Sequence, residues 1–256
     1  MPDPEMSDPE NLRSPVSAAA RPPRTWDFME TLFVALLADG AFMLTSGLAL
    51  TVMLIMHDGA GSLSPAELRS LWLQGNWQGA AIIAGCPPTL AVVWIATRMA
   101  GRDFAEYLAL NWPSAGEVVR ALVVMAIVLA IESVALSYAR ADYGIKHDLI
   151  VKNAGGLLVL LIGACVAAPI VEEFVVRGFM FRGWSESFAG PIGAIVLTSA
   201  AWAMTHTQYD WFGRFWVFVV GLVLGHFRWR TNSTWLTVMV HSAINTFVYF
   251  TMGPYT

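Results

Sequence analysis

Residues 156–181 read GLLVLLIGACVAAPIVEEFVVRGFMF, an apolar run that ends with two acids and an arginine. A helix needs about 20 consecutive, mostly apolar residues to cross the hydrocarbon core of a bilayer, and this stretch is long enough. Backbone amides cannot bind water in lipid, so the stretch is expected to be helical. It therefore predicts a membrane protein with charged side chains near the end of a spanning helix.

The rest of the chain has the composition of a polytopic membrane protein. Of its 256 residues, 56% are apolar and 13% are charged, and the mean hydropathy is +0.56, whereas about a quarter of the residues in soluble domains are charged. The sequence predicts an all-α, polytopic integral membrane helical bundle with about seven (seven or eight) transmembrane helices. The other candidate spans are residues 31–56, 77–97, 119–138, 191–207, 213–228 and 234–251.

The first 30 residues differ from everything that follows. Residues 1–30 are rich in proline, acids and serine, a composition that buries too little apolar surface to order itself. We therefore predict a disordered, acidic and proline-rich N-terminal tail on a transmembrane domain at 31–256. No cleavable signal peptide is visible, so the first span is expected to act as an uncleaved anchor.

The distribution of basic residues predicts the orientation in the membrane. Ten Arg and Lys fall in the tail and the loops on its side of the bundle, and five fall on the other side. The positive-inside rule then places the N-terminus in the cytoplasm. The expected location is a plasma membrane, in a bacterium the inner membrane.

Charge and cysteine content exclude other classes of protein. A net charge of −4 without a basic run argues against nucleic acid as a partner. The two cysteines, Cys86 and Cys165, lie inside apolar segments, so neither a disulfide framework nor a cysteine zinc site is expected.

Ionisable and polar side chains at apolar depth are the informative residues, because each costs a few kcal/mol to place in a membrane. Most of them fall between residues 172 and 245, which predicts a site built by the C-terminal helices. The full set is Asp39, Glu132, Glu172, Glu173, Arg177, His206, His226, His241 and Asn245.

Glu172, Glu173 and Arg177 form the first group. Glu173 and Arg177 are four residues apart with the acid first, which is the favourable order for an ion pair on a helix. Glu172 points about 100° away and lacks that partner, as a carboxylate that acts as a general base would. The alternative interpretation is a helix end whose charges all reach the lipid headgroups.

The other two groups contain histidine. Trp202 and His206 lie one turn apart at the end of the fifth span, where the histidine is either an interfacial side chain or a functional one. His241 and Asn245 share a face in the middle of the seventh span, where polar groups normally face a bundle interior or a water-filled cavity. A carboxylate, two imidazoles and an amide could activate water and stabilise an oxyanion, directly or through a metal.

These groups resemble the three motifs of the CPBP family of intramembrane proteases, which comprises CAAX proteases, including type II CAAX prenyl endopeptidases, and bacteriocin-processing (Abi) proteins. The family motifs are EExxxR, FxxxH and HxxxN on successive helices, and this chain carries them in that order within about residues 150–250. One departure is Trp202, which stands where the family usually has phenylalanine. An aromatic ring is retained, so we expect a reshaped cavity wall rather than lost chemistry.

The resemblance implies an endopeptidase that cuts a membrane-embedded or lipid-anchored peptide or protein near the cytoplasmic face of the membrane. Glu172 and His206 would activate the hydrolytic water. The family is usually described as metalloproteases, so Glu172, His206 and His241 form either a zinc site of two histidines and one carboxylate or a metal-free site for the water.

The remaining motif residues would support this chemistry. The resemblance implies that His241 and Asn245 stabilise the oxyanion of the tetrahedral intermediate, and that Glu173 and Arg177 hold the site together. Simple perpendicular helices would separate Glu172 from His206 by on the order of 15 Å. The catalytic interpretation therefore requires tilted or broken helices.

Two other functions fit the same composition. A proton-coupled secondary transporter could use Asp39, Glu132 and Glu172 as a relay, although no duplicated halves are visible. A non-catalytic scaffold or immunity factor would use the bundle without the chemistry. A simpler interpretation of Asp39 and Glu132 is a hydrogen-bonded pair, or two side chains that line one cavity.

Two further features have structural interpretations. His226, Arg228 and Arg230 are expected to form a cluster at the inner interface of the membrane. Pro87 and Pro88 are expected to kink the second span, because proline removes a helix hydrogen bond.

Overall fold

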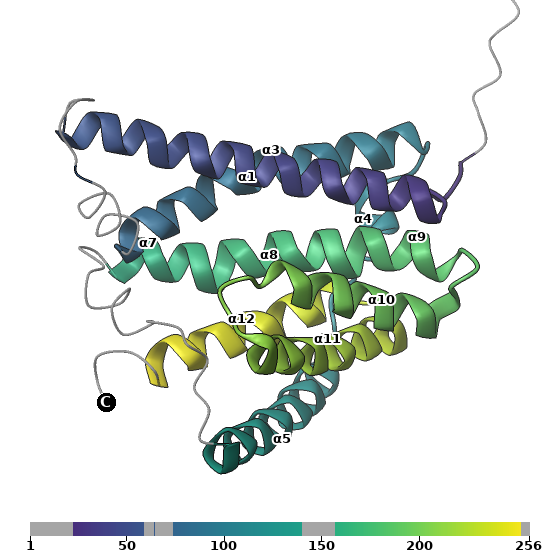
Figure 1. Cartoon of the computed structure of the whole chain (residues 1–256). Helices are drawn as coiled ribbons and strands as arrows, with labels where there is room; N and C mark the ends of the chain where they lie inside the picture. Colours follow the sequence, from purple (N-terminus) through teal and green to yellow (C-terminus); the bar gives the residue numbers. More distant parts are fainter. Residues whose placement is uncertain (1–22, 59–63, 65–73, 140–156, 252–256) are drawn as a thin grey trace, which may run out of the picture.

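The computed structural model describes residues 23–58, 64, 74–139 and 157–251, and the regular structure in these ranges is entirely helical (Figure 1). A helix overlaps every predicted span, so the all-α bundle is confirmed. The elements are α1 (Phe28–Asp58), α3 (Gly75–Met99), the short α4 (Phe104–Tyr107), α5 (Ala115–Ala139), a composite helix from α7 to α9 (Leu157–Ser185), α10 (Gly190–Thr205), α11 (Trp211–Thr231) and α12 (Thr234–Thr251).

Length and composition identify the helices that can cross a bilayer. Within the described residues these are Phe28–His57, Gly75–Met99, Ala115–Tyr138 and Leu157–Ser185, and α10 is apolar but shorter. Large apolar side chains such as Leu44 and Met56 are exposed on α1, as expected for a surface that faces lipid rather than water. The chain is an integral membrane protein.

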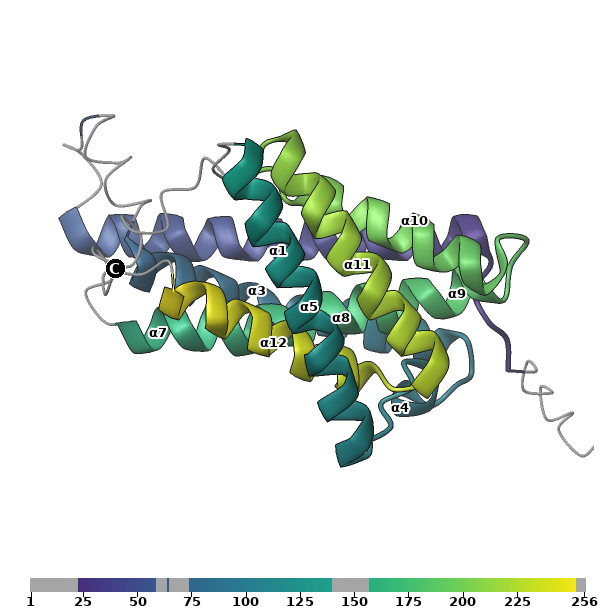
Figure 2. The ribbon, with the colours of Figure 1, turned by 90° about the horizontal axis from the view of Figure 1, so that it is seen from below.

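The helices pack in layers around the composite helix. Figure 1 shows α1 and α3 side by side on one face of it and α10, α11 and α12 on the other. Seen from below, α5 packs across α11 and α12 (Figure 2). The composite helix contributes Val176 and Met180 to one apolar core, and Phe174 and Phe179 to a second core that it shares with α1 and α3.

The composite helix is continuous but not uniform. Two wider, π-helical stretches, η1 (Ile162–Ala167) and η2 (Phe174–Met180), alternate with the α-helical segments α7 (Leu157–Leu161), α8 (Ala168–Glu173) and α9 (Phe181–Ser185). The two acids of the first motif end α8, between the two wide stretches. Such π-helical turns are often found at functional sites, because they change which side chains face a given neighbour.

A glycine pair brings α3 close to the composite helix. A Cβ atom at Gly163 would lie 2.7 Å from the Cα atom of Gly79, a separation that no real side chain tolerates. Close approach through small residues is a general way for membrane helices to associate. The contact anchors the stretch of the composite helix that leads to the motif acids.

Some predictions fall partly outside the described residues. Only residues 23–30 of the predicted tail are described, and here Trp26 is buried and its indole Nε1 donates to the carbonyl oxygen of Ala96 at 3.0 Å. This part of the tail therefore packs on the bundle. Pro87 and Pro88 lie inside α3, which continues through both.

Candidate active site

The two acids of the first motif have different surroundings. Glu173 and Arg177 are completely buried, and Arg177 Nη1 lies 3.0 Å from Glu173 Oε1. The predicted ion pair is confirmed, and its burial excludes the alternative in which these charges reach the headgroups. Glu172 instead lines two cavities of the bundle.

Arg177 is held by three further contacts. Its Nη2 donates to the carbonyl oxygen of Gly221 at 3.4 Å, and its guanidinium lies 4.3 Å from the centre of the Trp202 ring. Its own carbonyl oxygen accepts from Arg228 Nε at 2.9 Å. A buried charge pair needs such contacts to offset its desolvation. Arg228 is thus buried among protein side chains near the end of α11, and its place at the inner interface of the membrane stays a prediction.

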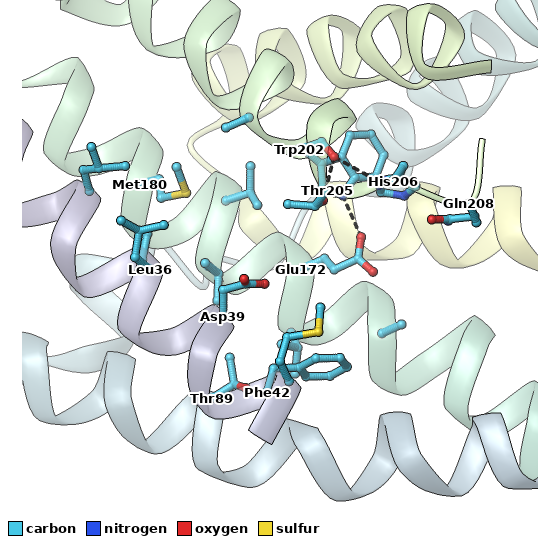
Figure 3. A pocket seen from close by; sticks show the side chains of 18 residues that line it. Leu36, Asp39, Phe42, Thr89, Glu172, Met180, Trp202, Thr205, His206 and Gln208 are labelled. Carbon is cyan, nitrogen blue, oxygen red and sulfur yellow. Dashed lines mark hydrogen bonds between the residues drawn. The ribbon is translucent and has the colours of Figure 1, made fainter. Parts of the chain in front are cut away.

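Trp202 connects the first motif with the second. Its indole Nε1 donates to Glu172 Oε2 at 2.6 Å, and Figure 3 shows this bond at the edge of the first cavity. The same ring packs edge-on against the imidazoles of His206, at 4.9 Å between centroids, and His241, at 5.2 Å. The side chain therefore touches residues from all three motifs.

His206 is oriented by the backbone of its own motif. It follows the last residue of α10, and its Nδ1 lies 2.8 Å from the carbonyl oxygen of Trp202. A carbonyl oxygen only accepts, so Nδ1 carries the proton and donates. In the neutral ring, Nε2 is then an acceptor. The ring also stacks on Tyr209, with 5.8 Å between centroids.

The third motif is tied to the first from α12. His241 is buried, and its Nδ1 lies 2.9 Å from Glu173 Oε1, the oxygen that also binds Arg177. An ionised carboxylate only accepts, so Nδ1 is again the donor. One turn later, Asn245 Nδ2 donates to the carbonyl oxygen of Ala164 in η1 at 2.7 Å. Both side chains are fixed by the composite helix.

Two cavities meet at these residues. The first, about 400 Å³ and mostly apolar, lies between α1, the composite helix and α10, and is lined on the α1 side by Leu36, Asp39 and Phe42 among others. The second, about 270 Å³ and more polar, lies between α5, α11, α12 and the composite helix. The residues that line both cavities are Ala168, Glu172, Trp202, His206 and Gln208.

The expected separation of Glu172 and His206 does not occur. Glu172 lies in the middle of the helix Leu157–Ser185 rather than near its end. The helix that leads to His206, α10, has 16 residues, which span about 24 Å and fall short of the roughly 30 Å hydrocarbon core. Because α10 stops early, both side chains reach the same cavities without a broken helix.

The three predicted zinc ligands do not converge in this arrangement. Both histidines leave Nε2 free, as many metal-binding histidines do. However, the Trp202 ring packs against both imidazoles, and no three His, Cys, Asp or Glu side chains in the described ranges are placed to hold a metal ion. We assign no reaction step to a metal, and zinc stays a prediction.

Asp39 and Glu132 lie in different places. Asp39 on α1 lines the first cavity and Glu132 on α5 lines the second. They therefore do not line one cavity as a pair, although each faces the cavity system that contains Glu172. His226 is exposed on α11 and contacts the rings of Phe227 and Trp229.

Sequence reasoning missed several polar groups of the second cavity. Gln208, Tyr209 and Tyr249 line it together with His241 and Asn245. Tyr209 stands three residues after His206, and this proximity in the sequence could have identified it as a residue of the site. Tyr249 stands one helical turn after Asn245 on the same face of α12, which the four-residue spacing also indicates.

Comparison with known proteins covers the region that contains all three motifs. Residues 154–247 match the Rce1-like family, described as type II CAAX prenyl endopeptidase Rce1-like. No curated protein and no solved structure matches the chain. The match begins before α7 and extends into α12, so it includes the composite helix, α10 and α11 but not α1 and α5, which also line the cavities. The chain is thus an integral membrane protein whose residues 154–247 are similar to the Rce1-like, type II CAAX prenyl endopeptidase family.

Proposed function

We propose that the chain is an intramembrane endopeptidase that uses water, activated by Glu172 and His206, to cut a peptide bond in a membrane-embedded or lipid-anchored protein. One observation carries the proposal: three motifs on three helices present Glu172, His206, His241 and Asn245 to one cavity of about 270 Å³. The family match supports proteolysis as the type of chemistry.

The water would be held between a carboxylate and an imidazole. His206 commits its Nδ1 proton to the carbonyl oxygen of Trp202, so its Nε2 can accept a hydrogen bond from the water. Glu172, with Oε2 engaged by Trp202, would receive the proton on Oε1. The resulting hydroxide attacks the substrate carbonyl carbon and forms a tetrahedral oxyanion.

The oxyanion would be stabilised from α12. Asn245 Nδ2 has two N–H groups and uses one on Ala164, so the other can donate to the oxyanion. His241 has committed its Nδ1 proton to Glu173. It can donate from Nε2 only as the imidazolium, whose charge the oxyanion would balance, since the charges of Glu173 and Arg177 already cancel each other.

Collapse of the intermediate completes the hydrolysis. The bond between the carbonyl carbon and the amide nitrogen breaks, and the proton held by Glu172 passes to the leaving amine. Water and one peptide bond thus become a carboxyl group and an amine, and Glu172 returns to its starting state. No group outside the motifs is needed for this balance.

The two cavities suit a substrate with an apolar part and a backbone to be cut. The first cavity is lined mainly by apolar side chains of α1, the composite helix and α10, as a lipid anchor or an apolar side chain requires. The second holds the polar motif residues.

We place the protein in a plasma membrane, in a bacterium the inner membrane, with a cytoplasmic N-terminus, as the distribution of basic residues indicates.

Glu172→Gln tests the proposal, because it keeps the shape of the side chain and removes the base. Glu117→Gln, at the N-terminal end of α5 and away from both cavities, is the matched control. The wild-type protein and both variants are placed in liposomes with a farnesylated fluorogenic peptide, and the termini of membrane proteins are compared in cells that express each form equally. Cleavage lost only in Glu172→Gln supports the proposal. Equal cleavage by all three forms would overturn it.

The same liposomes test the metal. We expect hydrolysis to survive exhaustive treatment with a zinc chelator, because the side-chain arrangement does not bring three ligands together. Loss of activity on chelation and its return on addition of Zn²⁺ would show that the predicted zinc set assembles during the reaction.

A further inference from the structure

We propose that Trp202 is a positioning residue that orients both water-activating groups, the Glu172 carboxylate through its indole N–H and the His206 imidazole through its carbonyl oxygen. This inference rests on the proposed role of Glu172 as the base. It assigns a function to the one motif position at which the chain departs from the family pattern.

The first contact is short and of a strong type. Indole Nε1 lies 2.6 Å from Glu172 Oε2, and Trp202 is only 5% exposed. The indole has a single donor and no acceptor, so this bond uses its whole hydrogen-bonding capacity. A hydrogen bond to an ionised carboxylate is about twice as strong as one between neutral groups. The bond fixes one carboxylate oxygen and leaves the other for water.

The second contact fixes the imidazole. His206 Nδ1 lies 2.8 Å from the carbonyl oxygen of Trp202, which determines the ring nitrogen that carries the proton. Glu172 lies on the composite helix and His206 just after α10, so no single helix fixes the distance between them. Trp202 is the residue that bonds to both, and it therefore sets their separation.

The indole ring is itself held from three sides. It packs edge-on against His206 and His241, and the Arg177 guanidinium lies 4.3 Å from its centre. A phenylalanine could keep an aromatic face toward these neighbours, but it has no N–H for Glu172. The ring packing and the hydrogen bond can thus be separated by one substitution, Trp202→Phe.

The control is a tryptophan with a similar environment away from the site. Trp184 on α9 is 4% exposed, and its Nε1 donates to the carbonyl oxygen of Phe28 at 3.1 Å. It lines neither cavity. Trp184→Phe therefore removes one buried indole hydrogen bond, as Trp202→Phe does, and reports the purely structural cost of that loss.

The activity test measures kcat, KM and the pH profile of both variants on the farnesylated fluorogenic peptide in liposomes. For Trp202→Phe we expect kcat to fall by about 10- to 100-fold, the value of a hydrogen bond to a charged group, with KM changed by less than about threefold. The acid limb of the pH profile should move to higher pH, because the ionised base loses a donor. Trp184→Phe should leave the pH profile unchanged.

A second test needs no substrate. Thermal unfolding in detergent is measured for Trp202→Phe, Glu172→Gln and the double variant. Two residues that bond to each other give a double variant whose melting temperature is higher than the two single losses predict. Trp184→Phe combined with Glu172→Gln should show additive losses.

The outcomes separate this inference from the proposed function. If Glu172→Gln is inactive but Trp202→Phe keeps the wild-type kcat and pH profile and its losses add, Trp202 is only a packing residue and the inference is wrong. If Glu172→Gln keeps full activity, the proposed function fails first. A shifted acid limb together with non-additive melting temperatures supports both.

Discussion

Two acid–base clusters in the molecule use the same side chains for different purposes. The buried cluster consists of Glu173, Arg177 and His241, and the exposed cluster, beside α4, consists of Arg102, Glu106 and Arg182. Both contain an Arg and a Glu four residues apart in the sequence, at 3.0 Å in the buried cluster and 2.6 Å in the exposed one. Judged by distance alone, the exposed pair would be expected to contribute more to stability than the buried pair.

Burial reverses that ranking. Both partners of the buried pair have 0% exposed side chains, whereas Glu106 is 49% exposed. A buried charge that loses its partner cannot be rescued by water, but an exposed one is resolvated at little cost. The buried cluster therefore fixes the helices around the site, whereas the exposed cluster at the end of the bundle contributes little to stability.

The largest expected effect is that of Arg177→Ala. It leaves the Glu173 carboxylate buried without its main partner, so the protein should lose about 3–5 kcal/mol of stability, seen as poor expression and a lower melting temperature in detergent. Arg102→Ala is the matched control and should cost less than about 1 kcal/mol. Similar losses in the two variants would contradict the contrast between the clusters.

Asn245→Ala separates an effect on catalysis from an effect on stability within the buried region. If Asn245 donates to the oxyanion, kcat should fall by about 10²–10³-fold, while the melting temperature falls much less than in Arg177→Ala. Thr246→Val, the next residue on the same helix and exposed, serves as the control. A loss in kcat below about fivefold would leave Asn245 with its bond to Ala164 and no direct part in the reaction.

Glu106→Gln should have a small effect on the exposed cluster. The neutral amide loses its ion pairs with Arg102 and Arg182, and an exposed pair contributes less than about 1 kcal/mol. The melting temperature in detergent should fall by no more than a few degrees, and hydrolysis of the peptide should be unchanged. A collapse of expression would mean that this cluster also supports the fold.

The smallest effect is a dependence on pH. The hydrogen bond from Arg102 holds the pKa of Glu106 below its ordinary value. A lowered pKa in the folded state stabilises the fold above the ordinary glutamate value, and this contribution disappears as the pH falls through the lowered value. The melting temperatures of wild type and Glu106→Gln should therefore converge below about pH 4. A gap that widens in acid would contradict the assignment.

The helical segments and the Glu173–Arg177 pair could be predicted from the sequence, because both follow from local periodicity. Apolar length predicts where a helix lies, and a spacing of four predicts which side chains share a face. The convergence of the motifs was expected from the family resemblance rather than from the predicted topology, which kept Glu172 and His206 apart.

Other features depend on packing between distant segments and were beyond the reach of periodicity. The burial of Arg228 follows from its bond to the backbone of Arg177, 51 residues away. The bond from Trp202 to Glu172 joins residues 30 apart. The π-helical stretches have no signature in hydropathy, because the residues around them are apolar on nearly every side of the helix. These features bring the site together.

The π-helical stretches also bear on which changes in length the chain can tolerate. Each accommodates an extra residue in a helix that would otherwise wind regularly. Deleting one residue within Ile162–Ala167 would let the helix return to regular winding while the segments before and after it keep nearly the same relative rotation, because a residue in a wide turn advances the rotation by less than the roughly 100° of a regular turn. Glu172 would then still face the cavity. A single deletion in a regular helix such as α3 would instead turn everything after it by about 100° relative to everything before it, so the wide stretches should tolerate a deletion better than the regular helices do.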